Sequence, residues 1–286
     1  MSATDLAKSP ALFDPIAPLY DRTRLVPPGV LDEMYDRLFA VSGLGSSPRI
    51  LDCGIGTGIT VEPLLQRGAR VFGLDVASEM LAILAGKARR AAWPLNLARA
   101  TVLAAPFRRS SFDAAMMVNV AHLIADWRTA AREIESLVRP GGHFVIAFRR
   151  PSAAESKLTQ QYLALQHRGL RRALSSASSS ALRILRRRVR GRHVGPRWER
   201  ALLGRATLVD QQIWKWDEEV ASRDVLHWLD RRYLSYQSPL DEEHHRRIVG
   251  VLAARVERGT EREWVKGKLA LSVFRFDRPV EPRGFA

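Results

Sequence analysis

The chain has 286 residues, of which 46% are hydrophobic, and a formal net charge of +15. This length can bury one sizeable α/β core plus an elaboration, and the hydrophobic fraction is ordinary for a globular protein. The single cysteine, Cys53, excludes an intrachain disulfide and a cysteine-cluster metal site. We see no secretory signal and no apolar run long enough to span a bilayer, and therefore expect a cytoplasmic protein without a metal site.

The positive charge is concentrated in one segment. Residues 168–205 contain twelve arginines, no lysine and one acid, Glu199, and so carry +11 of the net +15. Three interpretations stay open: a solvated arginine-rich face, a surface for an acidic ligand or an anionic membrane, and a contact with RNA phosphates. Nucleic acid is the disfavoured partner, because no recognisable RNA-binding module is appended.

The first strong signal in chain order is a short buried strand, Ile50–Leu51, that runs into Asp52 and a turn with glycines at positions 54, 56 and 58. Such glycines let the backbone turn sharply and let a ligand lie against main-chain atoms. A helix with apolar residues at helical spacing is predicted before this strand, and another begins near Thr60 and ends at Gly68.

The second strand, residues 69–75, ends in Asp75, which lies 23 residues after Asp52. This is about the spacing expected of an acid that holds the ribose hydroxyls in a βαβ nucleotide site. The dinucleotide fingerprint needs its third glycine at position 59, where this chain has Ile59. A pyrophosphate cradle is therefore disfavoured.

Further strands and helices alternate after Asp75. Strands are predicted over 96–102, 114–118 and 143–148, and helical spacing indicates helices over 126–137, 160–174, 182–189, 222–228 and 241–258. Asn119 and His122 lie just past the fourth strand, where open α/β sheets place their ligands. In the last strand, apolar residues on both faces over 269–276 predict that this end is covered on both sides. Five strands alternating with helices predict a parallel sheet with helices on both faces.

These landmarks resemble the class I S-adenosylmethionine (SAM)-dependent methyltransferases, in the type-11 branch similar to enzymes of ubiquinone and menaquinone biosynthesis. The resemblance rests on Asp-x-Gly-x-Gly-x-Gly at 52–58, Pro106-Phe107, Ser111-Phe112-Asp113 and Pro140-Gly141-Gly142, all in family order. It covers about residues 12–150 well and 207–277 in outline. It implies a Rossmann-like, doubly wound, seven-stranded and mostly parallel sheet with an antiparallel last strand. The implied parts are a cover for the cofactor site (1–45), the SAM-binding core (46–150), a helical lid (151–206) and the C-terminal part of the sheet (207–286).

The resemblance also implies which residues bind the cofactor: Tyr20, Arg24, Asp52, Gly54, Gly56, Gly58, Asp75, Val76, Met80, Thr101, Val102 and Asn119. Tyr20 could instead anchor an N-terminal packing helix. Thr101 departs from the family, which usually has an acid here that accepts a hydrogen bond from the adenine amino group. A hydroxyl can accept that bond, but without charge assistance.

The implied function is methyl transfer from SAM to an oxygen or nitrogen of a small aromatic or apolar metabolite, with S-adenosylhomocysteine (SAH) as the product. The sulfonium already activates the methyl group, so the protein has to position the acceptor and exclude water. His122 is the candidate base for an acceptor that must lose a proton, with a place in the pocket wall as its alternative role. The rivals are a lipid methyltransferase at a membrane surface and a non-catalytic SAM- or SAH-binding protein. We expect a monomer or a homodimer.

Overall fold

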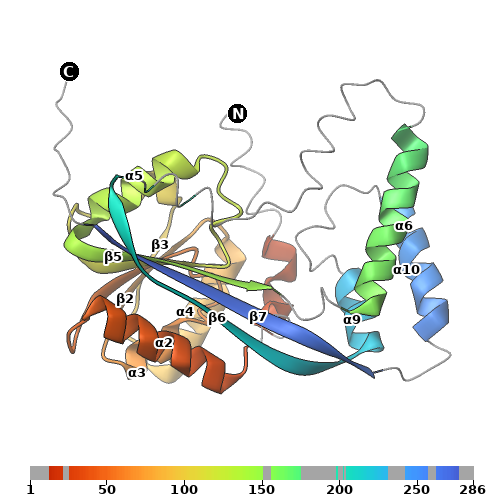
Figure 1. The fold of residues 1–286 in the computed structure, drawn as a ribbon, viewed down its shortest axis with the longest axis horizontal. Helices are drawn as coiled ribbons and strands as arrows, with labels where there is room; N and C mark the ends of the chain where they lie inside the picture. The colour runs from red at the N-terminus through yellow and green to blue at the C-terminus, as the bar shows by residue number, and fades with distance from the viewer. Residues whose placement is uncertain are drawn as a thin grey trace. The chain divides into compact units, whose positions relative to one another are not determined.

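The computed structural model describes residues 13–21, 26–150, 156–174, 198, 202, 204–230, 242–256 and 262–276. Seven strands form one sheet in the order β3-β2-β1-β4-β5-β7-β6 (Figure 1). The strands are β1 (Arg49–Cys53), β2 (Arg70–Asp75), β3 (Asn96–Arg99), β4 (Phe112–Val118), β5 (Val138–Arg150), β6 (Ala206–Ala221) and β7 (Arg262–Phe276). The pairs β1–β2, β1–β4, β2–β3 and β4–β5 are parallel. The predicted fold class, a mostly parallel Rossmann-like sheet with antiparallel pairing, is confirmed.

Helices cover both faces of this sheet. In Figure 1, α2, α3 and α4 lie on one face and α5 lies on the other. The described helices are η2 (Asp14–Leu19), α2 (Pro28–Ser42), α3 (Val61–Gln66), α4 (Ser78–Ala91), η4 (Val102–Ala104), α5 (Trp127–Leu137), α6 (Lys157–Leu174), α9 (Ser222–Asp230) and α10 (Glu242–Val256). Among them, no helix is both long enough and apolar enough to cross a bilayer.

The core forms where the central strands meet α5. Leu51, Ala115, Met117 and Phe144 are fully buried there, because central parallel strands are covered on both faces. As predicted, both faces of the last strand are covered at its C-terminal end, where Val273 and residues 274 and 276 are buried.

Several boundaries differ from the sequence prediction, among them those of the third and fifth strands. The third strand ends at Arg99 instead of residue 102, because the Thr101 side chain accepts a hydrogen bond from Leu103 N and caps the 3-10 helix η4. The fifth strand begins earlier than predicted, at Val138, and includes the Pro-Gly-Gly segment. Of the arginine-rich segment, residues 175–197 lie outside the described residues, as does the predicted helix over 182–189.

The chain divides into two compact units. Unit 1 contains residues 1–149, 193–214 and 269–286, and unit 2 contains residues 150–192 and 215–268. The boundary crosses β6 and β7, so each of these strands contributes to both units. In unit 2, α6, α9 and α10 pack around an apolar cluster that includes Leu158, Val225 and Leu252. Tyr162 belongs to the same cluster, and its buried hydroxyl lies 2.8 Å from His245 Nδ1.

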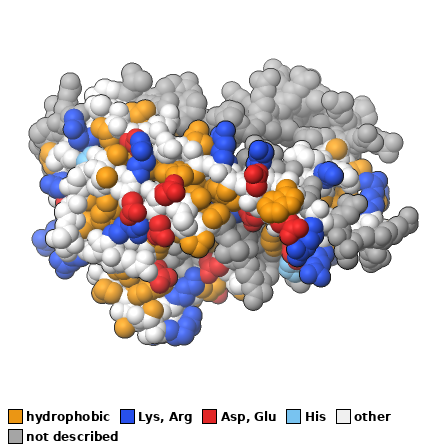
Figure 2. Space-filling view, turned by 60° about the horizontal axis from the view of Figure 1, so that its bottom comes forward, with side chains coloured by type: hydrophobic (Ala, Val, Ile, Leu, Met, Phe, Trp, Pro, Cys, Tyr) orange, Lys and Arg blue, Asp and Glu red, His pale blue; other side chains and the backbone are white. Residues whose placement is uncertain are grey.

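On the described surface, positive and negative side chains are interspersed. Figure 2 shows Lys and Arg side chains beside Asp and Glu side chains on the face that it presents. Ion pairs join α2 to β6 through Arg37 and Asp210, at 2.6 Å, and α5 to the turn before β6 through Glu135 and Arg205, also at 2.6 Å. Exposed pairs of this kind contribute little stability individually.

Candidate cofactor site

The glycine turn after β1 is held in one conformation by the neighbouring strand. The backbone N–H groups of Gly54 and Ile55 both donate to Leu74 O, at 2.7 and 3.1 Å. Gly54 has a φ of +84°, a left-handed conformation that favours glycine. A Cβ at this position would lie 2.4 Å from Val120 Cγ2, so the turn needs glycine for space as well as for conformation.

Asp75, at the end of β2, is fixed by backbone donors from two segments. Its Oδ2 accepts a hydrogen bond from Gly56 N and its Oδ1 accepts one from Ala77 N, both at 2.9 Å. Burial raises the pKa of this carboxyl, and the hydrogen bonds oppose the shift. A carboxylate oxygen can accept more than one bond, so Asp75 can still accept hydrogen bonds from ribose hydroxyls.

Asp52 lies behind the turn and does not line the cavity. Its Oδ2 accepts a short hydrogen bond from Thr60 Oγ1, while its Oδ1 has no hydrogen-bond partner among the described residues. The hydroxyl of the buried Tyr35 likewise has none in the described part of the chain. Burial raises the pKa of Asp52 to about 7, which the Thr60 hydrogen bond opposes and the charge of Asp75 reinforces.

The N-terminal segment, residues 13–21, is attached to this turn and to α4. Thr57 Oγ1 donates to Asp21 Oδ1 at 2.5 Å, and Lys87 Nζ donates to Asp21 Oδ2 at 2.5 Å and to Thr57 O at 2.8 Å. Asp14 Oδ1 accepts a further bond from Glu79 N at 3.1 Å. These contacts hold the segment in place. Arg24, predicted to bind the cofactor, lies outside the described residues.

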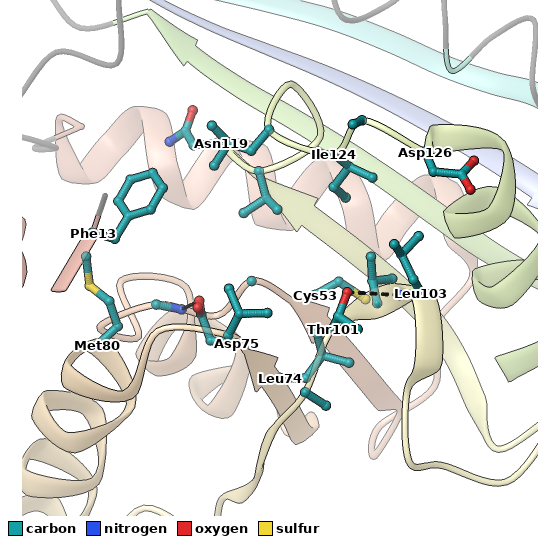
Figure 3. A pocket seen from close by; sticks show the side chains of 18 of the residues that line it. Phe13, Cys53, Leu74, Asp75, Met80, Thr101, Leu103, Asn119, Ile124 and Asp126 are labelled. Atoms are coloured by element: carbon teal, nitrogen blue, oxygen red, sulfur yellow. Dashed lines mark hydrogen bonds between the residues drawn. The ribbon is translucent and has the colours of Figure 1, made fainter. Parts of the chain in front are cut away.

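A cavity of about 430 Å³ opens over these elements in unit 1 (Figure 3). The structure brings nine of the predicted cofactor residues to its wall: Tyr20, Gly54, Gly56, Asp75, Val76, Met80, Thr101, Val102 and Asn119. Asp52 and Gly58 are not in the wall, since Asp52 lies behind the turn and Gly58 packs against Leu84. The wall also contains residues that sequence reasoning missed: Phe13, Cys53, Leu74, Ala100, Leu103, Val120, Leu123, Ile124, Ala125 and Asp126.

Two side-chain carboxylates, Asp75 and Asp126, are in the wall, and no lysine, arginine or histidine is among its described residues. Asp126 caps α5 by accepting a hydrogen bond from Thr129 N at 3.1 Å, and its hydrogen bonds to Thr129 lower its pKa. The wall is otherwise mostly apolar. Such a cavity suits a cationic ligand with ribose hydroxyls and an apolar ring, because acids favour a positive charge nearby.

His122 does not line the cavity. Its ring is half-buried and makes an edge contact with Phe148, with ring centroids 5.4 Å apart. Its role as a base therefore stays a prediction. Cys53 does line the cavity, but burial raises the pKa of its thiol far above the ordinary value, which keeps it protonated. The described residues contain no cluster of three or more potential metal ligands.

A doubly wound sheet with a cavity at the carboxyl ends of its central strands defines a Rossmann-like nucleotide-cofactor protein. Residues 51–146 match the family model described as a methyltransferase domain. A demethylmenaquinone methyltransferase of Mycolicibacterium paratuberculosis is 34% identical over 184 residues, which cover 62% of this chain and 77% of that protein. This chain belongs to the SAM-dependent methyltransferases, in the branch similar to enzymes of quinone biosynthesis. SAM, the cofactor of that family, fits the donors, acids and volume of the cavity.

Other relatives match over a smaller share of their length. The demethylmenaquinone methyltransferase of Renibacterium salmoninarum is 35% identical over 159 residues, which span 53% of this chain and 65% of that protein. A ubiquinone biosynthesis O-methyltransferase of Methylocella silvestris is 31% identical over 121 residues, 39% of this chain and 47% of its own. The chain thus spans just under two thirds of the first of these relatives.

Solved structures show the same fold at low sequence identity. YcgJ of Bacillus subtilis is 16% identical with a TM-score of 0.53, covering 86% of this chain and 99% of its own. The [4+2]-cyclase SpnF is also 16% identical with a TM-score of 0.53, and the match covers 95% of both chains. A protein named as a cyclase therefore shares this fold, so the fold alone does not establish methyl transfer.

Proposed function

We propose that this protein transfers the methyl group of SAM to an oxygen or nitrogen atom of a small aromatic or apolar metabolite. The observation that carries the proposal is Asp75, whose carboxylate is fixed by Gly56 N and Ala77 N in the wall of the cavity. That arrangement supports binding of the ribose, while the glycine turn supports binding of the part of SAM that bears the sulfonium.

The chemistry that SAM supplies is an activated methyl group whose bond to sulfur breaks as a lone pair of the acceptor attacks in line. The residues of this chain have to hold both partners and exclude water, a contribution worth about 7–11 kcal/mol of the barrier at best. Val120, Leu123 and Ile124 give the wall an apolar side next to the end of β4. An apolar wall excludes water and favours an aromatic or apolar acceptor.

The names of the relatives support one class of acceptor. Enzymes named for demethylmenaquinone and for ubiquinone biosynthesis are similar to 62% and 39% of this chain, respectively. This supports a phenolic or quinol-type ring as the first acceptor to test. A phenol must lose its proton during transfer, and His122, at the same edge of the sheet as the cavity, is the residue we propose for that proton.

The test has two steps. SAM and SAH are first titrated into the full-length protein by calorimetry, and micromolar binding of both is expected. SAH release is then measured with phenols, naphthoquinols and aromatic amines as acceptors. Release with one of these classes supports a methyltransferase, and tight SAM binding without release from any class supports a non-catalytic binding protein. Absence of SAM binding would overturn the proposal.

The proton role of His122 has a separate readout. His122→Ala is expected to lower turnover of a phenol at neutral pH while leaving SAH affinity within about twofold, because His122 is outside the cavity wall. The loss should shrink as the pH approaches the pKa of the phenol, since an ionised acceptor needs no base. An equal loss at every pH would assign His122 a purely structural role.

A further inference from the structure

Asn119, directly after β4, has an unusual backbone conformation. Its φ of +59° makes it one of three described non-glycine residues with positive φ, together with Ala92 and Ser110. Of these three, Asn119 alone lines the cavity. Asparagine tolerates this conformation better than most residues, but a left-handed non-glycine residue at a binding site suggests a role for its side chain.

Strand β5 determines how the Asn119 carboxamide is oriented. Asn119 N donates to Ala147 O at 2.9 Å, and Asn119 Oδ1 accepts from Arg149 N at 2.6 Å. A backbone N–H can only donate, so the atom that faces Arg149 N must be the oxygen of the amide. Nδ2 is therefore on the other side of the amide. In Figure 3 the nitrogen of Asn119 lies on the side of Phe13, at the edge of the cavity.

This orientation restricts what Asn119 can recognise. An amide nitrogen carries two N–H donors and accepts no hydrogen bond. No lysine, arginine or histidine is among the described residues of the wall, so the charged side chains that line the described wall are the acceptors Asp75 and Asp126. Asn119 adds donors to a wall whose charged groups can only accept.

We infer that the Asn119 amide donates a hydrogen bond to an oxygen atom of a bound ligand and thereby selects ligands that carry one. The inference rests on the proposed function. Two oxygens have the required chemistry: a carboxylate oxygen of the methionine part of the cofactor, and the phenolate or carbonyl oxygen of the acceptor. An amine acceptor fits poorly, because its N–H groups need acceptors and its lone pair must stay free for the methyl group.

Two variants separate recognition from structure. Asn119→Asp keeps an oxygen for Arg149 N and tolerates the left-handed backbone, but removes both N–H donors. Asn119→Gly also suits the backbone but removes the oxygen as well, so it breaks the link to β5. Asn96→Asp, at the start of β3 and outside the cavity wall, adds the same charge as a matched control.

The first arm compares SAH with 5′-methylthioadenosine, which lacks the amino-acid part, by calorimetry on the full chain. If the ligand oxygen is the cofactor carboxylate, Asn119→Asp and Asn119→Gly both weaken SAH binding roughly ten- to hundredfold. Both variants keep the affinity for 5′-methylthioadenosine within about twofold of the wild type, and Asn96→Asp leaves the affinities for both ligands unchanged. A purely structural Asn119 would instead lower the Tm of Asn119→Gly and leave SAH affinity intact in Asn119→Asp.

The second arm titrates 2-hydroxy-1,4-naphthoquinone, an aromatic ring with an ionised oxygen, into SAH-saturated protein. If the ligand oxygen belongs to the acceptor, both Asn119 variants weaken this probe about tenfold or more and bind SAH as the wild type does. Wild-type affinity of Asn119→Asp for SAH, with unchanged or undetectable probe binding in all variants, overturns the inference. Failure of the wild type to bind SAH would instead overturn the proposed function, so the two failures are distinguishable.

Discussion

Replacing Asp52 by asparagine should change how the stability of the protein depends on pH. Burial moves the pKa of this carboxyl from its ordinary value of 3.8 to about 7, so the folded state keeps a proton that the unfolded state releases. Between these two values, each pH unit lowers the free energy of unfolding by about 1.36 kcal/mol. The stabilisation that this proton gives the folded state is complete below pH 3.8 and is lost as the pH rises through 7. The total loss is about 4 kcal/mol of the free energy of unfolding.

The assay is urea denaturation of the wild type and Asp52→Asn at several pH values from 4.5 to 8.5. Asparagine cannot ionise, so the stability of Asp52→Asn relative to the wild type should increase with pH by about 1 kcal/mol per unit and level off above pH 7. Taking the difference removes the titration of all other groups. Asp224→Asn, on the exposed start of α9, is the matched control, because it removes an exposed carboxyl instead of a buried one. A flat difference for Asp52→Asn would show that its carboxyl ionises as in water and would refute the reasoning.

Three further predictions concern the cavity. Asp75→Ala should weaken SAM binding by about 1.5–3 kcal/mol in calorimetry, the range for a hydrogen bond to a charged group, and unchanged affinity would remove Asp75 from the ribose role. Gly54→Ala should lower the free energy of unfolding by about 2–5 kcal/mol in urea denaturation, because the added methyl group would lie 2.4 Å from Val120 in a left-handed backbone. The control is Gly29→Ala, where the added Cβ has no heavy atom within 4 Å, and its stability should stay near that of the wild type. Lys87→Met should raise the SAH dissociation rate about two- to fivefold in stopped flow by releasing the N-terminal segment, and an unchanged rate would contradict that coupling.

The sequence identified the elements that build the site but not the direction of every side chain in it. The strand, glycine turn and terminal acid of the βαβ unit were predictable because hydrophobic runs, glycine positions and the spacing to Asp75 are local signals. Successive residues of a strand point to opposite faces. Asp52 and Cys53 are neighbours in β1, and here Cys53 lines the cavity while Asp52 faces Thr60 behind the turn.

Other parts of the wall depend on contacts between distant segments. Phe13 reaches the cavity because Asp14 and Asp21 attach the N-terminal segment to α4 and to the turn, and no local pattern predicts those contacts. The sequence correctly placed His122 just after the fourth strand, but the loop after β4 turns its ring toward Phe148. The orientation of the Asn119 amide likewise depends on a strand 30 residues further along the chain.

The boundary between the two units passes through β6 and β7, and this affects how the protein can be engineered. A helical insertion is usually exchanged between relatives at exposed loops, where few contacts are cut. Here a chimera that replaces residues 215–268 of unit 2 must join its new segment at Trp214 and Leu269, in the middle of two hydrogen-bonded strands. The incoming segment therefore has to preserve the pairing of these strands, so unit 2 should be easier to exchange together with β6 and β7 than as helices alone.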